Sequence, residues 1–401
     1  MTEDERESDE ILDELRDMLD VEDLESTEPQ EAFSLWIQQL DRADSTMQSY
    51  RYRVTPFLEF LENRGIGDLA ELKTRHIKEF EARRRAGNLQ LQTLNNQFGT
   101  IRQFLQYCRE LNAVSEDVVA AIDVPNLSKE DRVNTEKLIT NRAEEILDNL
   151  NRYQYASRKH VLFLLLWHTP ARVGTIHSLD LEDVYLDDSD LDRIRKQLSQ
   201  EFVPSVVEEV LSKADPPFLL PRHHPETETP LKNGEDGERV INLFDEVGEV
   251  LDGYIRVNRD DVKDDYGKKP LLTSQRGDGR LSVPAMRNWI YILTQPCEFG
   301  GPCPHDRDPE TCEAREHGHG SKCPSSKSPH KLRTGSITMH RDRGWPPSAL
   351  AERANTSEEL IEGVYDQPQK LIRGSSRREF LDKLKETDHD SDNDTTANSD
   401  E

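Results

Sequence analysis

The sequence contains no long apolar run. The longest, from Val161 to Trp167, is far shorter than the roughly 20 residues that an α-helix needs to cross a bilayer. The acidic N-terminus also lacks the positive charge and the apolar stretch of a signal peptide. We therefore expect a cytoplasmic protein without a membrane partner. The 401 residues are 34% hydrophobic and 33% charged, a composition that suits two or three domains with a substantial core.

Positive charge is scarce as well. The chain has 52 Lys and Arg residues against 79 Asp and Glu residues, and its formal net charge is −27. An acidic excess in which arginine outnumbers lysine is typical of proteins from a high-salt cytoplasm, and acidic tails on a mesophilic protein are the alternative. Acidic stretches in the middle of the chain favour the first interpretation. Because the Debye length at molar salt is about 3 Å, the acidic surface does not exclude DNA as a partner.

Cysteine is rare: the chain has five, and four of them lie between Cys297 and Cys323. So few cysteines in a cytosolic chain of this length argue against a disulfide framework. Cys108 lies in an apolar helical pattern and is expected to be a buried core residue. The other four suit a tetrahedral structural zinc ion, although their spacing departs from the common CxxC form and a reduced, metal-free loop is the alternative. The candidate zinc ligands are Cys297, Cys303, Cys312 and Cys323.

The first third of the chain has the periodicity of helices. Residues 1–28 are an acidic arm with a short apolar stripe, which fits either a docking helix for a second subunit or a solvated arm. Residues 29–124 alternate apolar-periodic segments with short polar turns, a pattern that predicts a bundle of four or five helices. Residues 125–136 are polar and are expected to link this bundle to a second domain.

The remaining chain mixes helical and strand patterns. Residues 137–385 include a predicted hairpin, whose second strand runs from Arg239 to Leu243. This domain contains the Cys-rich insertion at 297–323, and the acidic tail at 386–401 is expected to be disordered. The predicted fold is mainly α with a small antiparallel sheet, and therefore belongs to the α+β class.

The fourth helical segment of the bundle, LQTLNNQFGTIRQFLQYCREL, has one apolar face and one face of amides, hydroxyls and arginine. Such side chains contact base edges and phosphates in DNA complexes, although most polar helix faces are simply solvated. Three consecutive arginines precede the segment and add positive charge. The candidate DNA-contacting residues are Arg83, Arg84, Arg85, Gln92, Asn96 and Arg102.

A candidate phosphate site begins at His330. His330 and Arg333 are three residues apart, so one helical turn places an imidazole and a guanidinium on the same face, where both can reach one phosphate. Tyr365, further along the chain, carries a hydroxyl that can attack such a phosphate.

Arg172 follows a long apolar helix, and burial of that helix fixes where the arginine lies. A buried arginine needs an anionic partner. A salt bridge to Asp180 or Asp183 is the structural alternative to a phosphate.

Four motifs occur in an order that resembles the tyrosine recombinase, or phage integrase, family in the form found in haloarchaea and their viruses. The motifs are ARVGTIHSLDLEDV, the lysine hairpin around LKNGEDGER, HKLRTGSITMHRDRG and ANTSEELIEGVY. The resemblance covers roughly residues 30 to 375. It implies a helical core-binding domain and a mixed α/β catalytic domain that form a clamp around double-stranded DNA.

The resemblance also implies an activity. The protein would be a site-specific recombinase that breaks and rejoins DNA through a 3′-phosphotyrosyl intermediate, with no ATP or catalytic metal, in the integration or excision of a mobile element. Covalent storage of the phosphodiester bond energy makes this possible. The protein would be a monomer or weak dimer in solution and a homo-tetramer on DNA, and residues 371–384 could form a helix that docks on a neighbouring subunit.

The resemblance gives each candidate residue a role. Arg172 and Arg333 would hold the non-bridging oxygens of the scissile phosphate, and Tyr365 would be the nucleophile. His330 would assist proton transfer at the nucleophile. Lys232 would protonate the leaving 5′ oxygen, and an exposed turn lysine without a catalytic role is the alternative.

Two positions depart from the common family pattern. Thr175 stands where many members have an acidic residue, and Asn355 stands where they have a second His or Trp. Asn355 can donate a hydrogen bond to a phosphate oxygen, but it cannot act as an acid or base. These departures keep two alternatives open: a non-catalytic DNA-binding protein with the same fold, and a DNA-relaxing enzyme of similar chemistry.

Overall fold

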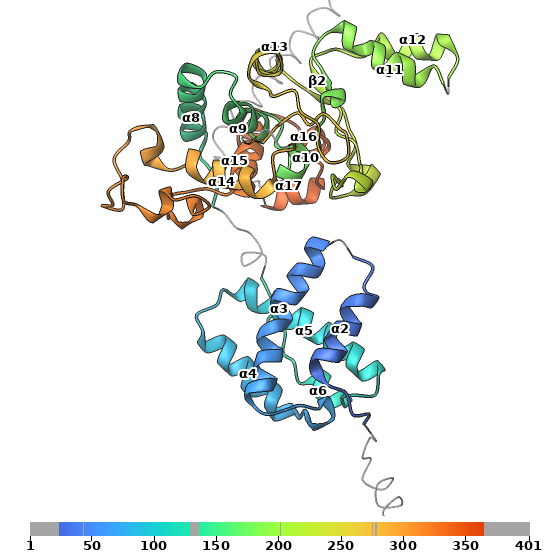
Figure 1. Ribbon diagram of the computed structural model, residues 1–401, viewed down its shortest axis with the longest axis vertical. Helices are drawn as coiled ribbons and strands as arrows, with labels where there is room; N and C mark the ends of the chain where they lie inside the picture. The colour runs from blue at the N-terminus through green and yellow to red at the C-terminus, as the bar shows by residue number, and fades with distance from the viewer. Residues whose placement is uncertain are drawn as a thin grey trace, which may run out of the picture. The chain divides into compact units, whose positions relative to one another are not determined.

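The computed structural model (Figure 1) describes residues 24–42, 44–128, 136–200, 202–274, 276 and 279–364. The chain divides into two compact units, Met1–Asn134 and Thr135–Glu401. The predicted acidic tail lies outside the described residues, as does the segment predicted to dock on a neighbouring subunit. Each unit has its own hydrophobic core and is taken separately below.

The N-terminal unit is a helical bundle. Pro29 begins its first described helix, where a missing N–H costs little because the first donors of a helix have no partner within it. Gly65 has a φ of +70° and reverses the chain after the second helix. The elements are α2 (Pro29–Gln39), α3 (Asp44–Asn63), the 3₁₀ turn η1 (Leu69–Glu71), α4 (Thr74–Ala86), α5 (Leu91–Glu110) and α6 (Glu116–Ala120).

Aromatic side chains fill the centre of this bundle. The ring of Phe80 in α4 lies 5.1 Å from that of Phe57 in α3 and 6.1 Å from that of Phe98 in α5. All three rings are buried, and burying each contributes about 1.5–3 kcal/mol to folding. Cys108 is fully buried on α5, and this burial raises the pKa of its thiol to about 12. The prediction that Cys108 is a core residue is confirmed.

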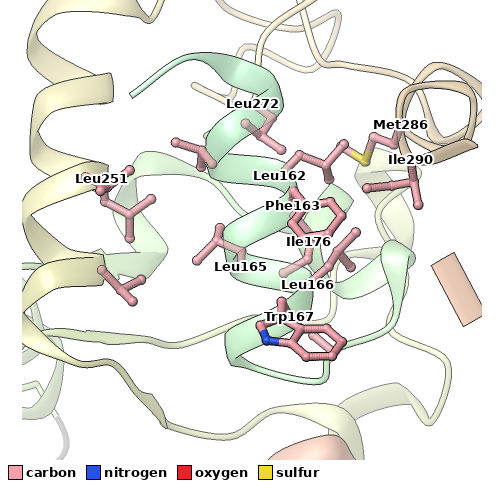
Figure 2. Close-up of a cluster of buried hydrophobic side chains, with 14 of the residues drawn as sticks. Leu162, Phe163, Leu165, Leu166, Trp167, Ile176, Leu251, Leu272, Met286 and Ile290 are labelled. Atoms are coloured by element: carbon pink, nitrogen blue, oxygen red, sulfur yellow. The ribbon is translucent and has the colours of Figure 1, made fainter. Parts of the chain in front are cut away.

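Helix α9 (Arg158–His168) lies at the centre of the C-terminal unit. Ser157 caps its start by accepting a hydrogen bond from the backbone N–H of His160. The helix is apolar on nearly every side and is therefore buried among other helices. Figure 2 shows its side chains Leu162 and Phe163 beside Met286 and Ile290 of a neighbouring helix. The helices in contact with α9 are α8 (Thr140–Tyr153), α10 (Val173–Ser178), α13 (Asp245–Gly253), α14 (Val283–Leu293) and α15 (Pro329–Asp342).

The sheet of this unit is small. Its strands β1 (Val184–Tyr185), β2 (Phe218–Leu219) and β3 (Ile241–Asn242) pair antiparallel in the order β1-β2-β3, with Leu219 opposite both Val184 and Ile241. The third strand is shorter than the predicted span from Arg239 to Leu243. Arg239 lies before the strand, and its guanidinium bonds to backbone carbonyls outside the sheet.

The other elements complete the C-terminal unit. In the sequence, helices α11 (Leu191–Leu198) and α12 (Pro204–Leu211) come between β1 and β2. Helices α16 (Pro347–Ala354) and α17 (Glu358–Val364) follow α15. A π-helical turn, η6 (Tyr254–Asn258), extends α13. The 3₁₀ turns are η2 (Leu181–Asp183), η3 (Asp188–Asp190), η4 (Pro225–Thr227), η5 (Gly234–Gly237), η7 (Pro296–Phe299), η8 (Glu313–Arg315) and η9 (Gly320–Lys322).

The predicted fold class is confirmed, because a mainly helical chain carries one small antiparallel sheet. Among the described helices, none combines the length and apolar character that a membrane span requires.

Candidate active site

Three arginines converge on the C-terminal end of α16. Arg239 Nε donates a hydrogen bond of 2.9 Å to the carbonyl oxygen of Arg353, and Arg333 Nη1 donates one of 2.7 Å to that of Ala354. Arg172 Nη1 donates one of 2.6 Å to the carbonyl oxygen of Asn355. The last carbonyls of a helix lack partners within it and carry partial negative charge. The end of α16 therefore offsets part of the positive charge that the three guanidinium groups bring together.

Arg172 lies where the chain leaves α9 and begins α10. It occupies the N-cap position of α10 and is half-buried. The carboxylates proposed as alternative partners contact other arginines: Asp180 pairs with Arg280 at 2.6 Å, and Asp183 lies 3.8 Å from Arg222. Asp180 and Asp183 thus have structural partners of their own.

Helix α15 supplies Arg333 and His330. Its N-terminus is capped by the Ser328 hydroxyl, which accepts a hydrogen bond from the backbone N–H of Lys331. Arg333 is only 3% exposed, and its Nη1 also donates to the carbonyl oxygen of Pro170 at 2.6 Å. Because α15 packs on α9, this contact fixes Arg333 beside the segment that carries Arg172.

His330 lies one turn before Arg333 on the exposed start of α15. Partial desolvation lowers the pKa of His330, and neighbouring positive charges lower it further. Those charges belong to Arg333, Arg172 and Lys232. The imidazole is therefore neutral at neutral pH and can accept a proton.

Lys232 lies in an exposed loop, residues 231–238, that we call the lysine loop. The Asn233 side chain in this loop donates a hydrogen bond of 2.7 Å to Asn355 Oδ1. A Cβ added at Gly237 would come within 3.1 Å of Asn355 Nδ2. The loop therefore packs against the residue that ends α16, and it places the charge of Lys232 near His330.

The structure thus brings together five of the six predicted catalytic residues. The sixth, Tyr365, lies outside the described residues and directly follows α17. The five are Arg172, Lys232, His330, Arg333 and Asn355.

Two further arginines at this site were missed from the sequence. Arg239 is half-buried, and its pKa is lowered to about 10 by burial and by the charges of Arg333, Arg172 and Arg353. Burial also lowers the pKa of Arg353 to about 10. Arg353 donates hydrogen bonds to the carbonyl oxygens of Asn242 and His168 at 2.8 and 3.1 Å. The alternating strand pattern that starts at Arg239 was the only sequence signal for either residue.

The predicted DNA-contacting arginines have partners within the N-terminal unit. Arg83 pairs with Glu79 at 2.9 Å, and Arg85 Nη2 bonds to an Asp123 carboxylate oxygen at 3.1 Å. Arg84 Nε donates to the Gln97 side chain at 2.8 Å. Arg84 and Arg85 therefore join α4 to other segments of the unit, whereas Arg83 pairs within α4. DNA contact by these residues stays a prediction.

The predicted contacts on α5 are also engaged. Arg102 donates to the carbonyl oxygen of Ile122, and Gln92 Nε2 donates to Asn96 Oδ1 at 3.2 Å, one turn along the helix. Gln92 and Asn96 therefore lie on one face of α5, as the helical spacing predicts. Whether this face meets DNA remains a prediction.

The structure does not support the predicted zinc site. Within the described part of the chain, no group of three or more His, Cys, Asp or Glu residues is arranged to hold a metal ion, and Cys297, Cys303, Cys312 and Cys323 are free thiols. Polar contacts hold the insertion instead, because Gln295 Nε2 donates to the carbonyl oxygens of Ala314 and Gly320. Metal analysis of the purified protein is the measurement that decides the question.

The fold and one segment of the sequence are similar to known proteins. Residues 33–110 match the family described as phage integrase, N-terminal SAM-like domain. The chain as a whole has the two-domain fold of tyrosine recombinases. No curated protein is significantly similar to it.

Several solved structures are similar to this chain. The integrase of transposon Tn1549, in complex with transposon right end DNA, is 14% identical with a TM-score of 0.55, over 89% of this chain and 99% of that one. A lambda integrase dimer bound to a core site is 11% identical with a TM-score of 0.53, over 87% and 77%. The N-terminal domain of a phage integrase/site-specific recombinase from Haloarcula marismortui is 33% identical over 25% of this chain and 99% of that one, with a TM-score of 0.24.

Proposed function

We propose that the protein is a site-specific DNA recombinase that breaks and rejoins DNA strands through a 3′-phosphotyrosyl bond to Tyr365. The observation that carries the proposal is the convergence of Arg172, Arg333 and the lysine loop on the C-terminal end of α16. A cluster of donors and cations suits a phosphodiester, because negative charge builds up on its oxygens during attack. The integration or excision of a mobile element is the task that we propose for it.

The two clamping arginines would bind the phosphate. Each guanidinium offers several N–H donors in one plane, a geometry that matches two phosphate oxygens at once. Arg172 and Arg333 are already oriented by backbone carbonyls, so little reorganisation is needed when the phosphate enters.

The attacking group would be the phenol oxygen of Tyr365. As this oxygen bonds to phosphorus, the bond from phosphorus to the 5′ oxygen breaks. The phosphotyrosine bond then conserves the energy of the broken phosphodiester bond. His330, neutral because of its lowered pKa, would accept the phenol proton directly or through water. The roles of His330 and Tyr365 rest on the family resemblance and on the place of Tyr365 directly after α17.

Lys232 would donate a proton to the leaving 5′ oxygen. The exposed side chain extends from a loop that is tied to Asn355, at the edge of the arginine cluster. In the second step a 5′ hydroxyl attacks the phosphotyrosine and its proton returns to Lys232, while the phenol oxygen leaves and takes back the proton held by His330.

Double-stranded DNA is the proposed partner. The related lambda integrase has been solved as a dimer on a core site and as a tetramer on a Holliday junction. We propose a homo-tetramer on DNA, and a monomer or weak dimer in its absence. No cofactor is required by the proposed chemistry.

A nicked duplex built from the DNA that flanks the gene tests the activity. Cleavage close to the nick releases a short fragment and traps the covalent adduct. We expect the wild-type protein to form an adduct that survives SDS, and we expect Tyr365→Phe to form none. Tyr153→Phe is the matched control, because Tyr153 is 70% exposed at the end of α8 and has no part in the proposed chemistry, so the substitution should leave the yield unchanged. An adduct that persists in Tyr365→Phe would remove Tyr365 from its role.

A non-catalytic DNA-binding protein is the second candidate. Thr175 is buried without the acidic group common at that position, and the Asn355 side chain already accepts a hydrogen bond from Asn233. Sequence-selective binding of the flanking DNA without any adduct would establish this candidate. Relaxation of supercoiled DNA without a preferred site would instead identify a DNA-relaxing enzyme.

A further inference from the structure

Arg239 joins the lysine loop to the end of α16. Its Nη1 donates a hydrogen bond of 2.9 Å to the carbonyl oxygen of Gly237 in the loop. Its Nε donates one of 2.9 Å to the carbonyl oxygen of Arg353 in the last turn of α16. One guanidinium thus spans two segments that are far apart in the sequence and that both contribute to the candidate active site.

The position of Arg239 lowers the free energy of unfolding of the protein. Burial lowers the pKa of Arg239 to about 10, together with the nearby positive charges of Arg333, Arg172 and Arg353. Its Nη2 is buried and has no hydrogen-bond partner among the residues that the structure describes. A buried donor without a partner costs about 1–3 kcal/mol. Fold stability alone therefore does not account for an arginine here, and sites of this kind are commonly retained for function.

The proposed role of Lys232 requires that the lysine loop be held in one position. Lys232 is exposed, and the backbone two residues later passes through Gly234 at a φ of +63°. A general acid must lie within hydrogen-bond distance of the atom that it protonates. The loop is held on one side of this turn by the bond from Asn233 to Asn355, and on the other side by Arg239.

We propose that Arg239 is a positioning residue that holds Lys232 in place to protonate the leaving 5′ oxygen. The inference rests on the proposed recombinase activity. Arg239 acts through the backbone of the lysine loop and does not itself exchange a proton. Its removal should therefore impair one chemical step, the departure of the 5′ oxygen, and leave phosphate binding by Arg172 and Arg333 in place.

A sulfur substitution in the DNA isolates that step. When sulfur replaces the bridging 5′ oxygen, the bond from phosphorus to sulfur breaks and the thiolate leaves with the electron pair. Because a thiol has a pKa of about 8.5, far below that of an alcohol, the thiolate needs no proton from the protein. A variant that lacks a correctly placed general acid should recover on this substrate.

The test measures adduct formation on the oxygen and sulfur substrates. We expect Arg239→Gln to cleave the oxygen substrate about 10- to 100-fold more slowly than wild type, which is part of the rate contribution of a general acid. We expect the defect to shrink to less than about threefold on the sulfur substrate, the same pattern as in Lys232→Ala. Arg172→Ala should stay impaired on both substrates, because it removes a phosphate contact.

Arg239→Lys serves as the conservative variant. A lysine keeps the charge but cannot make both hydrogen bonds, so we expect an intermediate defect on oxygen that also disappears on sulfur. An equal defect on both substrates in the folded variants overturns the positioning role. Absence of any adduct from wild type on both substrates, with DNA binding retained, overturns the proposed function itself and this inference with it.

Discussion

Asn355 holds a backbone conformation that few residues adopt. Its φ of 52° and ψ of 66° lie in the left-handed region, which asparagine tolerates better than most residues with a side chain. This turn ends α16, while the carbonyl of Asn355 accepts from Arg172 and its side chain accepts from Asn233. A tryptophan would not fit this backbone as readily. The backbone conformation therefore gives a structural reason for an asparagine at this position.

The pH dependence of cleavage should report on His330. Its pKa lies below the usual 6.5, because of desolvation and the neighbouring cations. The neutral imidazole, which would accept a proton in the proposed chemistry, is thus the main form at neutral pH, and it is lost as the pH falls through this lowered pKa. We expect single-turnover cleavage to be level near pH 7 and to decline on the acid side below pH 6.5.

The control for this pH dependence is His330→Gln, which cannot titrate. Its residual rate should show no decline over the same acid range. If the same acid limb persisted in this variant, another group would be the titrating base.

At the scale of elements, local sequence patterns predicted those helices whose formation depends on residues close together in the sequence. The apolar period of α9 and the polar face of α5 are local, and both helices form as expected. The bonds of Arg239 join residues that are 114 positions apart along the chain. No period or turn signal encodes such a contact, so the sequence revealed Lys232 but not the arginine that holds its loop.

The close packing of α15 against its neighbours requires a glycine at position 335. A Cβ at this position would lie 2.1 Å from the carbonyl oxygen of Leu138 and 3.1 Å from the Trp167 ring. We expect Gly335→Ala to destabilise the protein by about 1–3 kcal/mol, the usual cost of overpacking a core. The free energy of unfolding in urea measures this change.

Gly363 is the matched control for that experiment. It lies in α17, and a Cβ there would meet no atom within 4 Å. We expect Gly363→Ala to be neutral or to stabilise the protein by up to about 1 kcal/mol, because alanine favours helices. Equal destabilisation by both substitutions would show that the contact with Leu138 does not set the position of α15.

At the scale of the whole molecule, the net charge of −27 makes self-repulsion a central feature. Raising KCl from 0.1 M to 1 M shortens the Debye length from about 10 Å to about 3 Å. Weaker repulsion should stabilise the compact state. We expect the urea midpoint of unfolding to rise steadily with KCl, as a high-salt cytoplasm would require.

A neutral osmolyte at matched osmolarity is the control, because it does not screen charge. A midpoint that stays constant or falls with KCl would contradict the interpretation of the acidic composition as an adaptation to salt.

The carbonyl groups at the end of α16 have one more consequence. They hold Arg172 and Arg333 in position while no DNA is bound, so the proposed phosphate receptor would be complete before the substrate arrives. DNA binding would then not need to reposition these two arginines. The timing of strand cleavage would instead depend on when the hydroxyl of Tyr365, the residue that follows α17, reaches the bound phosphate.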